Sequence, residues 1–162
     1  MPAGLALAEE ELSIQRAIND LQLGDSLRTV EKIYPPLQDW PSYVEPRGGV
    51  NRIRIERGSA QSLPAHIETL WLGFKKDRLV EIKIVYDALY TREKPQEELA
   101  GDLALIYGEP RRSGNRIWWS DGATVLRALN EPVPVLTERG RKVVELRTCL
   151  QLMDEELLRR KP

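Results

Sequence analysis

The sequence predicts an α+β protein in which two related helix–antiparallel-sheet units pack as a two-layer sandwich. The main observation is the stretch Trp71–Tyr86, where apolar residues alternate with polar ones on both sides of the polar turn Lys75–Arg78. A second stretch, Trp118–Leu129, has the same pattern around Asp121-Gly122, a dipeptide typical of two-residue hairpin turns. Segments with helical spacing precede both hairpins, so we expect helices to cover one face of the sheet.

Four segments are predicted to be helical. Residues Glu9–Leu23 have apolar side chains at helical spacing, three acidic residues at the start and Gly24 at the end. A second helix begins after Asp25 or Ser26 and stops before Pro35, a third runs from Pro95 to Tyr107, and a short one covers Gln151–Arg160. The side chains expected to face inward are Ile14, Ala17, Ile18 and Leu21; Leu27, Val30, Ile33 and Tyr34; and Leu99, Ala100, Leu103, Ala104, Ile106 and Tyr107.

Further strands are expected at Asn51–Arg57, with Ile53 and Ile55 on one face, and at Lys142–Leu150. Pro132–Thr137 is expected at a sheet edge, because a proline lacks the N–H that an inner strand needs. Residues 35–49 are rich in proline, glycine and aromatic groups and predict an ordered loop.

The length of 162 residues suits a single compact domain over residues 9–162. An internal repeat is indicated, with halves at about residues 25–90 and 95–150. The matching segments are Ile33-Tyr34-Pro35 with Ile106-Tyr107-Gly108, and Phe74-Lys75-Lys76-Asp77 with Trp118-Trp119-Ser120-Asp121.

Residues 1–8 allow two interpretations. Ala6-Leu7-Ala8 has the small-x-small form of a signal-peptidase site, so these residues would be the remnant of a signal peptide in an exported protein. The alternative is a native, disordered start of small residues in a cytoplasmic protein. A periplasmic or other extracytoplasmic location is therefore an expectation.

Composition and motifs exclude several function classes. The chain has 24 basic and 25 acidic residues, so no global field attracts nucleic acid, and no apolar run reaches the roughly 20 residues of a transmembrane helix. Cys149 and His66 are the only residues of their types, which argues against cysteine or histidine metal clusters. Nucleotide-loop, hydrolase and zinc-protease motifs are absent from the sequence. We therefore expect neither an enzyme nor a cofactor.

A short pattern occurs in both halves. In the first half it consists of Gly24, Ser26, Val30 and Tyr34-Pro35-Pro36, followed by the hairpin with Phe74 and Asp77-Arg78-Leu79, and in the second half of Tyr107-Gly108-Glu109-Pro110 with Trp119 and Asp121-Gly122. This pattern resembles small envelope lipoproteins of the SmpA/BamE-like type, which are related to a component of the outer-membrane β-barrel assembly machinery. The sequence departs from that family in lacking a lipobox cysteine, in having Pro35 at a glycine position, and in doubling the unit. The resemblance implies a non-enzymatic envelope protein that contacts other proteins.

The cluster of Arg47, Arg52, Arg54 and Arg57 with Trp40 and Tyr43 allows two interpretations, a basic and aromatic binding patch or a solvated strand face beside a packed loop, and the neutral net charge favours the second. Trp118 and Trp119 are adjacent, so in a strand their side chains must point to opposite faces of the sheet. Trp71 likewise points to the face opposite that of its apolar neighbours. We expect a second layer of structure to cover the tryptophans that point away from the core. The leading hypothesis is a non-catalytic protein-interaction or scaffold module that binds through a sheet edge or the Trp40–Tyr43 loop. The alternative is a small-ligand-binding module with a pocket between helices and sheet, lined by Trp71, Trp118 or Tyr34. An enzyme that uses His66 is a third hypothesis. The candidate binding residues are Trp40, Tyr43, Arg47, Arg52, Arg54, Trp71, Trp118 and Trp119, and a second basic cluster is Arg111, Arg112 and Arg116.

Overall fold

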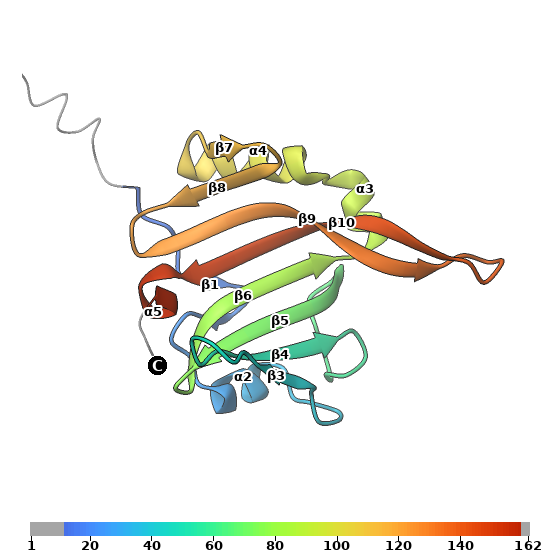
Figure 1. Ribbon diagram of the computed structural model, residues 1–162, viewed down its shortest axis with the longest axis horizontal. Helices are drawn as coiled ribbons and strands as arrows, with labels where there is room; N and C mark the ends of the chain where they lie inside the picture. The colour runs from blue at the N-terminus through green and yellow to red at the C-terminus, as the bar shows by residue number, and fades with distance from the viewer. Residues whose placement is uncertain (1–11, 160–162) are drawn as a thin grey trace, which may run out of the picture.

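The computed structural model describes residues 12–159, and its main feature is one large antiparallel sheet (Figure 1). Within this range eight strands follow the order β3-β4-β5-β6-β10-β9-β8-β7, and β1 and β2 form a separate two-stranded sheet. The prediction of two helix–sheet units packed as a sandwich is therefore wrong. The reason is that β6 and β10 pair directly, which fuses the strands of both halves into a single sheet.

The sheet strands are β3 (Ser42–Val44), β4 (Asn51–Glu56), β5 (Ile67–Lys75), β6 (Arg78–Tyr86), β7 (Arg111–Ser113), β8 (Arg116–Ser120), β9 (Thr124–Leu136) and β10 (Lys142–Asp154). The other elements are β1 (Ala17–Ile18), β2 (Leu21–Gln22), α2 (Leu27–Ile33), α3 (Ala88–Glu93), α4 (Gln96–Tyr107) and α5 (Glu155–Arg159). None of the helices in the described part is long and apolar enough to cross a membrane.

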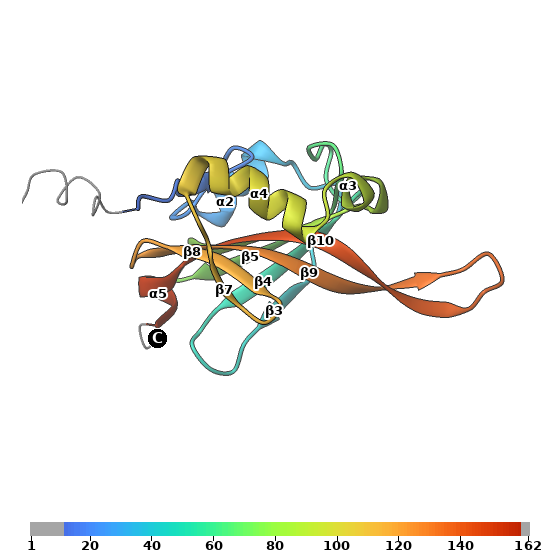
Figure 2. The same ribbon diagram turned by 90° about the horizontal axis from the view of Figure 1, so that it is seen from above.

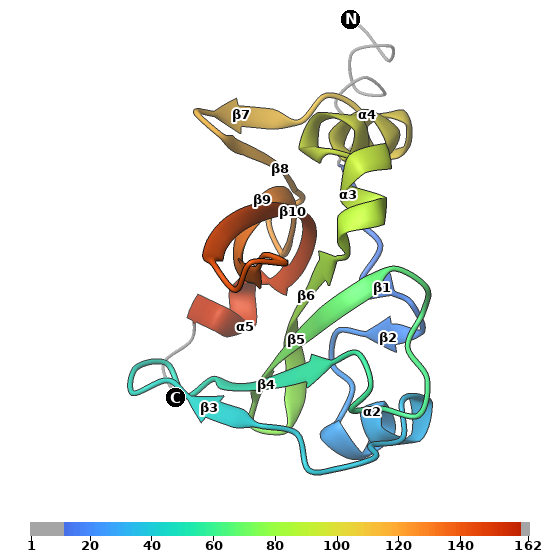
Figure 3. The same ribbon diagram turned by 90° about the vertical axis from the view of Figure 1, so that its right-hand side faces the viewer.

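The two faces of the sheet differ in what covers them. Helices α2, α3 and α4 lie on one side, called here the helix face, whereas α5 lies at one end of the other side, called the open face (Figure 2). Figure 3 shows that the sheet curves around the open face from β7 to β3. Residues of one parity on each strand therefore pack under helices, and residues of the other parity line the open face.

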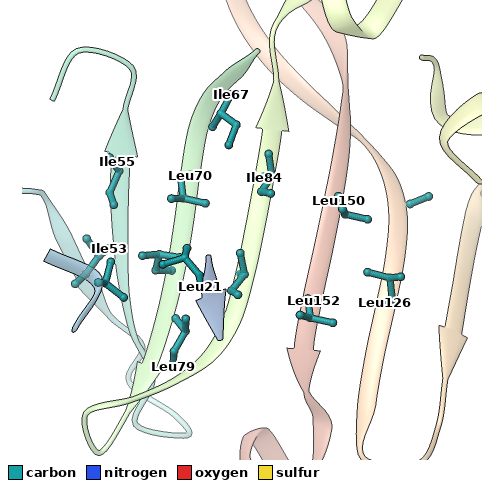
Figure 4. Packing of buried hydrophobic residues seen from close by; sticks show 14 of the residues in the cluster. Leu21, Ile53, Ile55, Ile67, Leu70, Leu79, Ile84, Leu126, Leu150 and Leu152 are labelled. Carbon is teal, nitrogen blue, oxygen red and sulfur yellow. The ribbon is translucent and has the colours of Figure 1, made fainter. Parts of the chain in front are cut away.

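The core lies between the sheet and the elements on the helix face. Figure 4 shows apolar side chains from β4, β5, β6, β10 and β9, together with Leu21 of β2. Leu72, Ile82 and Leu152 are fully buried, and Val30 of α2 joins the same cluster. At roughly 25 cal/mol per Å² of buried apolar surface, this single core is the main stabilising contribution.

The predicted hairpin at Trp71–Tyr86 is confirmed as β5 and β6. Lys76 and Asp77 form the turn and both have positive φ angles, of 51° and 59°. The turn is also a tertiary contact, because an Asp77 carboxylate oxygen accepts a hydrogen bond from the backbone N–H of Leu27 at 3.1 Å. The start of α2 is thereby fixed to the end of the hairpin.

The segment predicted as a helix over Glu9–Leu23 is wrong for the residues described. Instead, Ala17–Ile18 and Leu21–Gln22 pair around Asn19 and Asp20, whose φ angles are 50° and 70°. Asparagine and aspartate tolerate this left-handed conformation better than most residues. Ile14 and Leu21 are nevertheless buried, as predicted.

The other predicted helices are partly correct. Helix α2 begins after Ser26, whose hydroxyl accepts from the Thr29 N–H, and it ends before Pro35 as predicted. Helix α4 also matches its prediction in extent, but Ile106 is 71% exposed rather than buried. The last predicted helix begins too early, because β10 continues to Asp154 before α5 starts.

Strands β9 and β10 extend beyond the rest of the sheet as a two-stranded arm (Figure 1). The predicted edge strand Pro132–Thr137 is the outer part of β9, and it pairs with β10 through contacts such as Pro134 opposite Val144. Its other edge is free of β8, which pairs only with residues 125–128 of β9. Leu136, Val144 and Leu146 on this arm are each more than half exposed.

The two predicted halves have a similar order of elements. Helix α2 precedes strands β3–β6, and α4 precedes β7–β10. The proposed alignment of hairpins does not follow that order, because β5–β6 are the third and fourth strands of their half and β8–β9 are the second and third. The internal repeat stays a prediction.

Candidate functional site

One row of paired residues crosses seven strands on the open face. Arg54 on β4 is opposite Trp71 on β5, and Trp71 is opposite Lys83 on β6. The row continues across the β6–β10 junction and ends at β7. Its members, in order, are Arg54, Trp71, Lys83, Gln151, Arg127, Trp118 and Arg111. This cross-strand row contains four cationic residues and two tryptophans and no carboxylate.

Aromatic and cationic side chains gather at the β4–β5 end of the row. The Tyr43 and Trp71 rings have centroids 6.0 Å apart, and the Arg54 guanidinium lies 5.8 Å from each ring centroid. Such cation–π contacts contribute about 0.5–1 kcal/mol at partly exposed sites. The Nε atom of Arg54 is buried without a hydrogen-bond partner in the described structure, although it lies 3.3 Å from a Glu56 carboxylate oxygen. Tyr43 itself is 48% exposed.

The centre of the open face is occupied by protein ion pairs. Glu81 is 4% exposed and is bound by Arg52 Nε at 2.8 Å and by the side-chain amide of Gln151. Beside it, Lys83 pairs with Glu131 at 3.0 Å. Lys83 in the middle of the row and Arg54 at its β4 end are thus each paired with a carboxylate of the protein.

The β7–β8 end of the row differs because its arginines are not compensated. A groove of about 470 Å³ opens here, lined by Arg111, Arg116 and Arg127, by Trp118, and by one acidic residue, Glu155. None of the three arginines forms an ion pair with another residue in the range 12–159. The remaining lining residues are Ile117, Ser120, Val125 and Leu129.

The structure divides the predicted binding residues into two groups. Tyr43, Arg54 and Trp71 lie together at one end of the open face, and Trp118 lies at the other end. Arg52 is also on this face but is held by Glu81 and Glu45.

The other predicted residues lie elsewhere. Trp119 is on the helix face, 1% exposed, and donates a hydrogen bond from Nε1 to the Gly108 carbonyl at 2.8 Å. Trp40 packs against the core and donates to the Ser59 carbonyl at 2.9 Å, and Arg47 is exposed in the turn between β3 and β4. The expected second layer over the outward tryptophans is not found among the described residues, since Trp118 lines a groove.

The expected pocket between helices and sheet does not have the predicted lining. Trp71 and Trp118 both lie on the opposite face, and the Tyr34 hydroxyl donates to the backbone carbonyl of Asn19. Burial, together with the nearby charge of Asp20, raises the pKa of Tyr34 to about 12. These three residues therefore do not line one site.

His66 lies beside Asp87, the residue that caps the start of α3. Its Nδ1 lies 3.2 Å from a carboxylate oxygen of Asp87, and the other oxygen of Asp87 accepts from the Tyr90 N–H at 2.8 Å. Burial raises the pKa of Asp87, but these hydrogen bonds and the charges of His66 and Arg57 outweigh it, so the net direction is down. An ionised Asp87 thus caps the start of α3 and contacts His66.

The described part of the chain contains no cluster of side chains that could bind a metal ion and no reactive thiol. Residues 12–159 include no group of three or more histidine, cysteine, aspartate or glutamate side chains placed to hold a metal ion. Cys149 is fully buried beneath the open face, and burial raises the pKa of its thiol to about 12. The thiolate that would react or ligate a metal is therefore scarce at neutral pH.

Sequence reasoning missed three members of the row, which are Lys83, Arg127 and Gln151. A signal for Arg127 existed, because it has the parity opposite to the buried Leu126 and Ala128 in a strand that was predicted. Gln151 had no such signal, since it fell in a segment predicted as helix.

No protein-family model, curated protein or solved structure was found to match this chain. The resemblance to SmpA/BamE-like lipoproteins accordingly stays a prediction from sequence.

Proposed function

We propose that this protein is a non-catalytic, extracytoplasmic interaction protein that docks a partner protein on the open face of its sheet. The observation that carries the proposal is the cross-strand row, which exposes arginine and tryptophan at both ends and contains no carboxylate. Tryptophan, tyrosine and arginine are the residue types that contribute most to protein–protein interfaces. The extracytoplasmic location depends on Ala6-Leu7-Ala8, which lie outside the described residues.

The protein-interaction hypothesis thus gains a specific surface. Sequence alone favoured a sheet edge or the Trp40–Tyr43 loop, whereas the geometry favours the face between Tyr43 and Trp118. The two ends of the row are separated by six inter-strand steps, or about 29 Å at the usual strand spacing. A surface of that length suits the footprint of a protein better than that of a single small molecule.

Site-specific photocrosslinking in the native cells tests this proposal. A photoreactive side chain is placed at Leu129, which lines the groove, and in a control protein at Leu105, which is 89% exposed on α4. We expect a discrete protein adduct from position 129 that position 105 does not give. Adding Trp118→Ala to the protein that has the photoreactive side chain at position 129 should remove the adduct. Equal adducts from both positions, or none from position 129, would contradict the proposal.

A further inference from the structure

Within residues 12–159, the groove beside Trp118 has more positive than negative side chains, and no described carboxylate pairs with its arginines. Arg111, Arg116 and Arg127 come from three adjacent strands, and all three are exposed. Arg111 and Arg127 flank Trp118 directly, because both are its cross-strand partners. The acidic lining residue, Glu155, is itself paired with Arg159. The groove therefore presents at least three positive charges around one partly exposed indole ring.

We infer that this groove binds a carboxylate-rich segment of the partner protein; the inference rests on the function proposed above. Arginine guanidinium groups bind carboxylates through two parallel hydrogen bonds, and three guanidiniums on neighbouring strands can hold two or more acidic side chains. Trp118 provides an apolar surface for the intervening residues. The groove volume of about 470 Å³ is in the range of about 300–1,000 Å³ typical of binding sites.

The shape of the site favours a peptide over a small anion. A second hollow of about 580 Å³ adjoins the groove and shares Arg111, Ser120 and Glu155 with it. Because the two hollows share lining residues, a chain segment can contact both parts at once. Nucleic acid is disfavoured because the whole chain has a net charge of −1, which gives no global attraction for a phosphate backbone.

A peptide-library selection on the purified full chain tests the inference. Random decapeptides are selected on the wild-type protein and on the double variant Arg111→Gln/Arg127→Gln. We expect peptides rich in aspartate and glutamate to be enriched on the wild type and not on the double variant. The control is the double variant Arg28→Gln/Lys32→Gln, since both residues are exposed on α2 and their replacement removes the same two units of charge from the far side of the sheet.

Binding of the best selected peptide is then measured by fluorescence anisotropy at two salt concentrations. Trp118→Ala should weaken binding about tenfold or more. Each single arginine substitution should weaken it roughly twofold to fivefold. Glu155→Gln should strengthen binding about twofold, because it removes the acidic residue of the lining. A stronger complex is a result that damage to the fold would not produce.

Three outcomes would overturn the inference. The first is no enrichment of acidic residues, the second is selection of the same peptides by the double variant and the wild type, and the third is tighter binding of a dodecamer of deoxythymidine than of the peptide at equal salt. Photocrosslinking separates this failure from that of the proposed function. A Trp118-dependent adduct with a partner whose crosslinked segment is not acidic would retain the proposed function and reject the acidic ligand.

Discussion

Adjacent tryptophans on opposite faces allow a direct comparison of structural and binding roles. Trp119 is 1% exposed, so Trp119→Ala should cost about 3–5 kcal/mol of unfolding free energy from lost packing. Loss of its 2.8 Å hydrogen bond to the Gly108 carbonyl adds about 1 kcal/mol. Trp118 is partly exposed on the groove, and Trp118→Ala should cost only about 1 kcal/mol.

Urea unfolding followed by far-ultraviolet circular dichroism measures both effects, because tryptophan fluorescence would itself be changed by the substitutions. If the unfolding free energy falls by about 2 kcal/mol per molar of urea, Trp119→Ala should lower the unfolding midpoint by roughly 2–3 M and Trp118→Ala by roughly 0.5 M. Total stability of about 5–15 kcal/mol leaves room to observe the larger loss. Trp119→Phe keeps an aromatic ring and loses the hydrogen bond, so its midpoint should fall between those of the wild type and Trp119→Ala.

The two variants should have opposite effects on binding. Trp118→Ala should lose the crosslink from position 129 while remaining folded, and Trp119→Phe should retain it. Equal midpoint shifts for the two alanine variants would refute the assignment of the tryptophans to different faces. Loss of the adduct in Trp119→Phe with an unchanged midpoint would refute the binding role assigned to the open face.

Three further predictions concern other parts of the molecule. The carboxylate of Asp121 accepts hydrogen bonds from the N–H groups of Ile14, Ala123 and Thr124. Burial raises the pKa of Asp121, but these hydrogen bonds and the charge of Arg16 lower it on balance. The ionised Asp121 should therefore stabilise the fold fully above about pH 5, and this contribution should be lost as the pH falls through and below 3.8. Asp121→Asn should therefore flatten the acid side of a plot of melting temperature against pH, and an unchanged acid slope would contradict this. The Cys149 thiol, whose pKa burial raises to about 12, should resist iodoacetamide at pH 8 in the folded protein and react in 6 M urea, as mass spectrometry can show; alkylation at equal rates in both would contradict the burial. Replacing residues 133–145 of the β9–β10 arm by Asn-Gly should change the melting temperature little, since this part of the arm pairs mainly with itself, and a large fall would show that the arm supports the core.

Local patterns were sufficient to predict the elements that depend on nearby residues. The β5–β6 hairpin was predicted because its alternation and its polar turn are contiguous in sequence. Ser26 and Pro35 fixed the ends of α2 through a side-chain cap and a missing N–H. The parity of Trp118 and Trp119 correctly placed them on opposite faces before any fold was known.

Predictions failed where a distant part of the chain decides the structure. The backbone N–H of Ile14 is bound by Asp121, 107 residues away, and this contact fixes the N-terminal segment in a non-helical conformation. The apolar side chains of Leu152 and Met153 fit a helix, yet both residues are extended because β6 and β9 flank them on both sides. In such segments tertiary pairing outweighs the modest energies of local propensity.

The candidate site follows from the same non-local pairing. Trp71 and Trp118 each belong to a hairpin that the sequence predicts, but their alignment in one row depends on Lys83 facing Gln151 across β6 and β10. A shift of that register by one residue would move every β10 side chain to the other face. Gln151 would then leave the open face, and Glu81 would lose one of its two partners while remaining buried. The pairing register of β6 and β10 is therefore fixed by the buried Glu81 carboxylate as well as by the apolar core. This register in turn aligns the arginine and tryptophan residues at the two ends of the cross-strand row.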